Sequence, residues 1–161
     1  MSFIRLKKIN DKEYAYLVEN KWYKRKAKGK NKGPRQKVSK YLGRSYSFDK
    51  VNDDDFFSFK KIDDLSKYLK KGKSGIIRDL VEWELFRHNI CKDDFLVDLD
   101  NKIVKKGKKE VSLRINEGFL NSFTLDRLFR LRIGDSYHLA KCFIEAGIEV
   151  PKDVFVGMFG S

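Results

Sequence analysis

The chain has 161 residues, of which 41% are hydrophobic and 14% aromatic, so it is too apolar for a disordered tail and long enough for one hydrophobic core or two small ones. Its formal net charge is +13, and no apolar run approaches the ~18 residues that span a bilayer. Residues 1–8 lack the apolar core of a signal peptide. We therefore predict a folded cytoplasmic protein without a membrane segment, and the two cysteines predict no disulfide framework.

Most of the positive charge lies in one stretch. Residues 21–50 carry 12 Lys or Arg against one acid, Asp49, so they hold +11 of the total charge of +13. A field concentrated in this way attracts polyanions and raises the rate at which they meet the protein. Because nucleic acid is the polyanion that such a stretch favours, the charge pattern predicts a binding partner and says little about chemistry.

The N-terminal third has the pattern of a small antiparallel sheet. Residues 3–9 read as a strand, a turn follows, and residues 13–22 read as its hairpin partner. Period-two spacing places Tyr14, Tyr16 and Val18 on one face of that second strand. We expect Ile4 and Leu6 of the first strand to pack against this face.

A basic loop and a third strand complete this module. Residues 24–34 contain two glycines and a proline and read as a flexible hairpin loop. Residues 35–44 read as a strand with Val38 and Leu42 facing inward and Tyr41 facing outward. We thus predict a three-stranded basic sheet over residues 1–46, with an SH3-like half-barrel as one arrangement, and a linker over residues 47–61.

The remaining residues, 62–161, alternate between helical and strand patterns, which predicts an α+β body. A β meander is expected at about 95–115, with period-two alternation and a lysine-rich tip. The apolar stretch after Pro151 must dock on the body or on a partner protein. The helices are expected at about 62–71, 74–88, 124–131 and 135–146.

Residues 24–44, which we call the basic arm, are the strongest candidate site. Lys and Arg neutralise phosphates and release counterions, and ammonium groups on a loop suit backbone contact better than base reading. The aromatic residues beside it have two interpretations: they stack on unpaired bases, or they belong to the sheet core. Trp22 and Tyr23 are neighbours in a strand, so only one of them can face the core. The candidate nucleic-acid-binding residues are Lys21, Trp22, Tyr23, Lys24, Arg25, Lys26, Lys28, Lys30, Lys32, Arg35, Lys37, Lys40, Tyr41 and Arg44.

A second lysine-rich tip has an open interpretation. It extends the binding surface if the fold places it beside the first arm, and otherwise it is an ordinary hairpin end that guards against edge pairing. The role of Arg127 and Arg130, which share a predicted helix face, is open in the same way. The tip consists of Lys105, Lys106, Lys108 and Lys109.

Metal and catalytic sites are weaker hypotheses. His88 with Cys91 and His138 with Cys142 have spacings that suit a tetrahedral zinc ion, yet each of these residues also has an ordinary structural interpretation. We therefore expect no metal ion and no cofactor. The acidic residues that a nuclease would need are adjacent or explained by helix-end electrostatics, so we expect no catalysis. These acids are Asp53, Asp54, Asp55, Asp63 and Asp64.

The string FIRLKKINDKEYAYLVENKW, followed by PRQKVSKYLGR, resembles the short basic N-terminal segment of insertion-sequence DDE transposases, which carries a YYYLVE…R-Q-K-V-x-x-YLG pattern. The resemblance covers residues 1–44 and implies nucleic-acid contact through this sheet. It does not carry over catalysis, because the chain after residue 44 is too short for a full RNase-H-like catalytic domain. The matching residues are Tyr14, Tyr16, Leu17, Val18, Glu19, Arg35, Gln36, Val38, Tyr41, Leu42 and Gly43.

These observations together predict a non-enzymatic nucleic-acid-binding protein. RNA is slightly favoured over DNA, by analogy with the lysine-rich loops of ribosomal and ribosome-associated proteins. A DNA-binding or DNA-processing protein related to mobile elements is one alternative. A protein-interaction module whose basic arm meets an acidic partner is the other.

Overall fold

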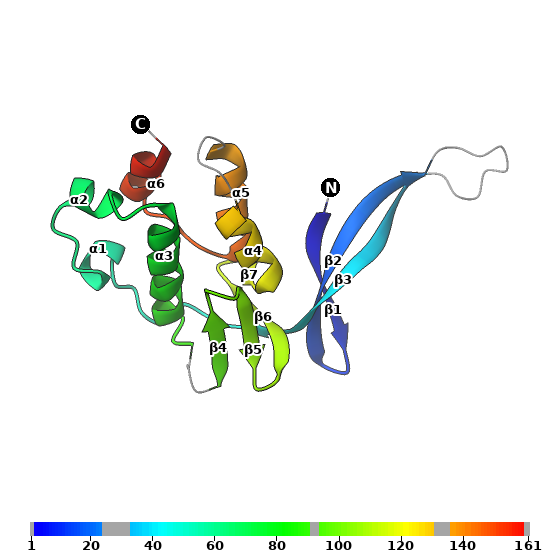
Figure 1. The fold of residues 1–161 in the computed structure, drawn as a ribbon. Coiled ribbons are helices and arrows are strands. Elements are labelled where there is room, and N and C mark those ends of the chain that lie inside the picture. Colours follow the sequence, from blue (N-terminus) through cyan, green and yellow to red (C-terminus); the bar gives the residue numbers. More distant parts are fainter. Residues whose placement is uncertain (1, 24–32, 91–93, 131–135, 160–161) are drawn as a thin grey trace.

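The computed structural model describes residues 2–23, 33–90, 94–130 and 136–159 (Figure 1). Its strands are β1 (Ser2–Ile9), β2 (Lys12–Tyr23), β3 (Gly33–Ser47), β4 (Phe95–Asp98), β5 (Ile103–Lys106), β6 (Lys109–Ile115) and β7 (Gly118–Leu120). Its helices are α1 (Phe56–Phe59), α2 (Leu65–Leu69), α3 (Lys73–Arg87), α4 (Ser122–Arg130), α5 (Ser136–Ala146) and α6 (Lys152–Phe159). The predicted α+β class is confirmed.

Strand β3 joins the N-terminal sheet to the body. Its first part pairs antiparallel with β2, as the sequence predicts, and β1 pairs antiparallel with β2. Its last residues, Arg44–Ser47, pair in parallel with Val111–Arg114 of β6. The strands therefore form one sheet in the order β1-β2-β3-β6-β5-β4, with β7 also paired to β6. Among the described strands no pairing closes β1–β3 into a half-barrel.

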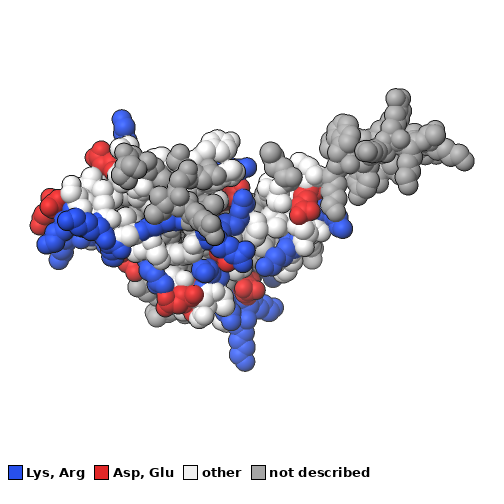
Figure 2. Space-filling view, turned by 45° about the horizontal axis from the view of Figure 1, so that its top comes forward, with Lys and Arg blue, Asp and Glu red and all other residues white. Residues whose placement is uncertain are grey.

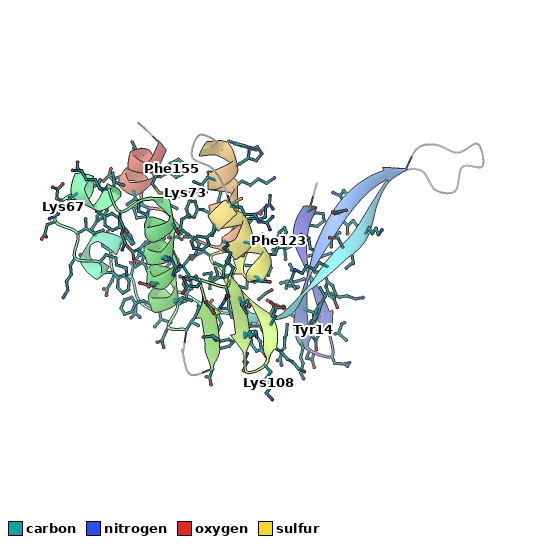
Figure 3. All side chains as sticks on the ribbon, in the orientation of Figure 1. Tyr14, Lys67, Lys73, Lys108, Phe123 and Phe155 are labelled. Atoms are coloured by element: carbon teal, nitrogen blue, oxygen red, sulfur yellow. The ribbon has the colours of Figure 1, made fainter. Side chains whose placement is uncertain are left out.

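The N-terminal sheet packs on the body through the face opposite to the one predicted, although Val18 on the predicted face is also buried. Ala15 and Leu17 of β2 are buried, and Ile4 and Leu6 of β1 pack against them rather than against Tyr14 and Tyr16. Both faces of β2 are apolar, so period-two spacing alone could not select between them. The small side chain of Ala15 lets this face approach α4. The other residues of this cluster are Leu42 of β3 and Phe123 of α4, and Phe123 lies between α4 and the sheet (Figure 3).

The prediction that Val38 faces inward is wrong, because β3 contains two β-bulges. The register slips between Ala15 and Tyr16, and again between Leu17 and Val18, so β3 carries an extra residue at each point. One extra residue turns the following side chains to the opposite face of the sheet. Val38 is accordingly 57% exposed, whereas Leu42 is 4% exposed as predicted.

Residues 47–61, predicted as a linker, contain α1 and are packed on the body. Phe56 of α1 is fully buried and meets Trp83 of α3 edge to face, with ring centroids 5.4 Å apart. The backbone N–H groups of Val51 and Asn52 donate hydrogen bonds to the carbonyl of Arg87. The aromatic residues of this segment therefore belong to the main core.

Two of the acids weighed as metal ligands begin helices instead. Asp55 accepts a hydrogen bond from the backbone N–H of Ser58 at the start of α1. Asp64 accepts hydrogen bonds from Ser66 and Lys67 at the start of α2. Side-chain acceptors of this kind satisfy the free N–H groups of a helix N-terminus. Because Asp64 is the cap, α2 is shorter than the predicted helix at 62–71.

The remaining predicted elements are present with shifted ends. Helix α3 spans residues 73–87, one residue from its prediction, and the meander is formed by β4, β5 and β6. Helix α4 starts two residues earlier than expected, because Asn121 and Thr124 exchange hydrogen bonds at its N-terminus. The apolar C-terminal stretch forms α6, whose Val154 is buried. None of the helices in the described ranges is long and apolar enough to cross a membrane.

Asp79 on α3 links three elements at the helical end of the body. Its carboxylate, 7% exposed, accepts hydrogen bonds from Tyr68 Oη at 2.6 Å and from Lys71 Nζ at 2.7 Å, and Lys60 Nζ lies 3.3 Å away. Burial by itself would raise the pKa of Asp79, but these three partners outweigh it and hold the pKa below its usual range. The ionised form therefore stabilises the fold.

We expect Asp79→Asn to lower the free energy of unfolding at pH 7 by about 1–3 kcal/mol, because it leaves two cations without their shared acceptor. The depressed pKa contributes stability above about pH 3.9, and this contribution is lost as the pH falls through the folded-state value. Urea unfolding of Asp79→Asn and of the unaltered protein is measured from pH 7 to pH 2. The difference between their free energies of unfolding should shrink at low pH. Asp53→Asn, at an exposed position, is the control. A difference that persists at pH 2 would contradict this account.

Candidate nucleic-acid interface

A basic cleft lies where the N-terminal sheet meets the body. Here β3 changes its partner from β2 to β6, and the β5–β6 hairpin stands beside it. The cleft has a volume of about 470 Å³. Figure 2 shows basic side chains gathered where the body meets the N-terminal sheet. We call this hollow the junction cleft, and its basic lining residues are Lys12, Lys40, Arg44, Lys106 and Lys109.

Gly43 allows the two parts of the sheet to approach closely. Its φ is +95°, a conformation that side chains disfavour. A Cβ atom built there would lie 2.3 Å from the carbonyl oxygen of Glu110. Glycine is therefore required for β3 to reach β6, and this approach is what places Arg44 beside the β5–β6 hairpin.

In the part of the chain that the structure describes, the cations of the junction cleft have no acidic partners. Within the described ranges, none of its five Lys and Arg residues lies within 4 Å of a carboxylate, and the cleft contains one acid, Glu110. Some basic residues of the body, such as Lys60, Arg78 and Arg87, form ion pairs, and others are single exposed lysines; the cleft differs in gathering five such cations around one hollow. Positive charge in the junction cleft is therefore left for a ligand to neutralise.

Tyr46 aligns two of these cations. The guanidinium carbon of Arg44 lies 4.8 Å from the centre of the Tyr46 ring, and Lys106 Nζ lies 4.7 Å from it. The ring itself packs edge to face on Phe95, with centroids 5.3 Å apart. Because cation–π contacts of this kind are attractive, Tyr46 holds one cation of β3 and one of β5 side by side.

Three further tyrosines lie on the open face of the N-terminal sheet. Tyr41 on β3 is 52% exposed, and its ring centre lies 5.2 Å from that of Tyr16 and 6.3 Å from that of Tyr14. Burial, followed by the neighbouring phenol groups, raises the pKa of Tyr41 above its usual value. The Tyr41 hydroxyl therefore stays neutral and does not repel an anion.

The structure brings only some of the predicted site residues together. Lys40, Tyr41 and Arg44 line the junction cleft, and Lys37 is exposed further along β3. The backbone of the residues on either side of the loop lies in β2 and β3, but their side chains are outside the described part: Lys21, Trp22, Tyr23 and Arg35. The loop residues themselves are outside the described ranges: Lys24, Arg25, Lys26, Lys28, Lys30 and Lys32.

Several residues of the site were missed or left open by the sequence. Lys106 and Lys109 of the second tip do lie beside β3, whereas Lys108 is at the end of the hairpin (Figure 3). Lys12 and Tyr14 were not identified as site residues: Lys12 lies just before the strand predicted at 13–22, and Tyr14 was assigned to the packed face. Arg127 forms an ion pair with Glu145, and Arg130 with Asp126; these residues are therefore partnered within the protein.

The possible zinc ligands do not form a cluster in the described ranges, where no three His, Cys, Asp or Glu residues gather as metal ligands do. His88 is buried at the end of α3 and its Nδ1 lies 2.9 Å from the carbonyl of Glu84. Cys142 is part of the main core on α5, where burial raises the pKa of its thiol. Cys91 lies outside the described residues.

Sequence and structure were both compared with known proteins. No family model, curated protein or solved structure matched the chain. The resemblance of residues 1–44 to transposase N-terminal segments therefore stays a prediction. The function has to be inferred from the junction cleft and from the open face of the N-terminal sheet, which carries Tyr14, Tyr16 and Tyr41.

Proposed function

We propose that the protein binds nucleic acid by contacting its phosphate backbone at the junction cleft and along β3. The observation that carries this proposal is the set of five cations in the cleft without ion pairs in the described part of the chain. Clustered cations without acidic partners are costly for folding because they repel one another, and phosphates would relieve that repulsion. A binding role accounts for this arrangement without any catalytic step.

Strand β3 connects the cleft with the basic arm. Lys37, Lys40 and Arg44 lie along the same strand, from the exposed hairpin down to the cleft. A backbone that follows β3 into the cleft would meet Lys40 and Arg44, which both line it. Lysines and arginines arranged in this way fix the position of a nucleic acid without reading its sequence, so we propose binding with little sequence preference.

The proposal predicts binding that weakens steeply with salt. For single strands the logarithm of the association constant falls with the logarithm of salt concentration with a slope of about −0.7 per neutralised phosphate, and for B-DNA about −0.9. Five contacts in the cleft thus predict a slope of about −3.5 or steeper. Fluorescence anisotropy with labelled oligonucleotides between 50 and 200 mM KCl measures it. Absence of binding to every nucleic acid, or binding that salt does not change, would overturn the proposal.

The same titration separates the alternatives left open by the sequence. Single-stranded RNA, single-stranded DNA and both duplexes are compared at one salt concentration. Preference for RNA would support a ribosome-associated or other RNA-binding role. Preference for duplex DNA would support a role related to mobile elements, in line with the resemblance of residues 1–44 to transposase N-terminal segments.

A further inference from the structure

We infer that the open face of the N-terminal sheet binds unpaired bases, so that the preferred ligand is a single-stranded nucleic acid. This inference rests on the proposed function and adds the class of nucleic acid. It is carried by the position of three tyrosines, Tyr14, Tyr16 and Tyr41, on the face of the sheet opposite to the one that packs on Phe123 of α4.

The strand register places these tyrosines among cations on one face. Residues opposite each other in an antiparallel pair point to the same side of the sheet. Tyr16 is opposite Arg5 on β1 and Tyr41 on β3. Tyr14 is opposite Lys7 on β1 and Arg44 on β3, so these three residues form a row across the three strands. Aromatic rings thus run across the middle strand, with basic side chains on both edges.

The opposite face of this sheet explains why the tyrosines remain available. Ala15, Leu17 and Leu42 are buried on that face and meet Phe123 of α4. Since the sheet docks on the body through small aliphatic residues, the aromatic face is turned toward solvent. Tyr14 and Tyr16 are half-buried, and each packs against Tyr41, which is half exposed.

Two hollows beside these rings provide a path for a strand. The junction cleft contains Tyr14 and Tyr41 together with its cations. A second groove of about 370 Å³, lined in part by Arg5, Lys7 and Tyr16, lies on the β1 side. Tyr16 of this groove and Tyr41 of the junction cleft have ring centres 5.2 Å apart, so the two hollows are neighbours at this pair.

The geometry favours unpaired over paired bases. The ring centres are 5.2 and 6.3 Å apart and the rings are tilted by 46° and 39°. Bases in a stacked helix are separated by about 3.4 Å and expose only their edges, so a duplex cannot place a base face on each ring. A single strand can separate its bases and lay one on each tyrosine, while its phosphates contact the neighbouring cations.

The test removes the rings without changing charge. In Y16T/Y41T the threonines keep a high strand propensity but cannot stack. Each lost base contact should weaken binding of a labelled single-stranded 20-mer of RNA or DNA roughly 10- to 100-fold, whereas the slope of affinity against salt should stay unchanged because the tyrosines are neutral. Y16F/Y41F, which keeps both rings, should bind within about threefold of the unaltered protein.

Two further measurements separate this inference from the proposed function. An oligonucleotide with abasic sites in place of its central bases should bind the unaltered protein as weakly as the intact oligonucleotide binds Y16T/Y41T. Tyr137→Thr, at an exposed tyrosine on α5, is the control for loss of a surface ring. If duplexes bind as tightly as single strands and Y16T/Y41T binds normally, the single-strand inference is wrong while phosphate binding stands. If no nucleic acid binds, the proposed function itself fails.

Discussion

Replacing Lys40, Arg44, Lys106 and Lys109 together by glutamine is expected to weaken nucleic-acid binding by two or more orders of magnitude at 50 mM salt. Each residue lines the junction cleft, and none has an ion pair in the described part of the protein. Each lost phosphate contact should lower the salt slope by about 0.7 for a single strand. The four substitutions should therefore reduce the magnitude of the slope by up to about 3, as measured by anisotropy.

A variant of equal charge change serves as the control for net charge. Lys61, Lys67, Lys70 and Lys152 are exposed lysines of the body, and Lys67 lies at the far end from the N-terminal sheet (Figure 3). Their replacement by glutamine removes the same four charges but none from the cleft. If both variants lose affinity and slope equally, binding depends on overall charge and the cleft has no special role. Circular dichroism and thermal melting establish that both variants are folded.

Gly43→Ala is expected to be the most destabilising single substitution at the junction. The left-handed conformation alone costs an alanine about 1–2 kcal/mol. The added Cβ would also lie 2.3 Å from the Glu110 carbonyl oxygen, so β3 and β6 would have to separate. We expect a loss of at least about 3 kcal/mol in the free energy of unfolding, measured by urea denaturation, with weakened protection from hydrogen exchange at Arg44–Ser47.

Gly72→Ala isolates the contribution of the close approach. Gly72 has φ +94°, almost the same as Gly43, but a Cβ there would meet no atom within 4 Å. This variant should thus show the cost of the backbone conformation alone, and the difference between the two variants is the cost of separating the strands. Equal destabilisation by both substitutions would show that contact between Gly43 and Glu110 is unimportant.

The local pattern of the sequence was enough to predict the elements but not their faces. Alternation in residues 3–9 and 13–22 predicted β1 and β2, and the helical spacing near Trp83 predicted α3 to within one residue. The face of the N-terminal sheet could not be predicted, because β2 is apolar on both sides. Two bulges, which leave no signal in the hydrophobic pattern, then turned Val38 outward.

The candidate site could be predicted only where it is local. The charge of β3 identified Lys40 and Arg44, and the aromatic pattern identified Tyr41. The parallel pairing of Arg44–Ser47 with Val111–Arg114 joins segments more than 60 residues apart, and it decides that Lys106 and Lys109 belong to the same surface. A pairing at that distance depends on tertiary packing, so the second lysine-rich tip remained an open question at the level of sequence.

Strand β3 also sets a minimum length for a ligand that uses the whole surface. Between Gly33 at its start and Arg44 in the cleft, an extended strand covers about 35 Å, since each residue advances about 3.3 Å. Pairing with β2 on both sides of the two bulges fixes the two ends relative to each other, so a ligand bound at one end is held at a high effective concentration near the other. At the duplex spacing of about 3.4 Å per nucleotide this distance corresponds to about 10 nucleotides, and a single strand with separated bases spans it with fewer. Affinity should therefore rise abruptly at a length no greater than about 10 nucleotides.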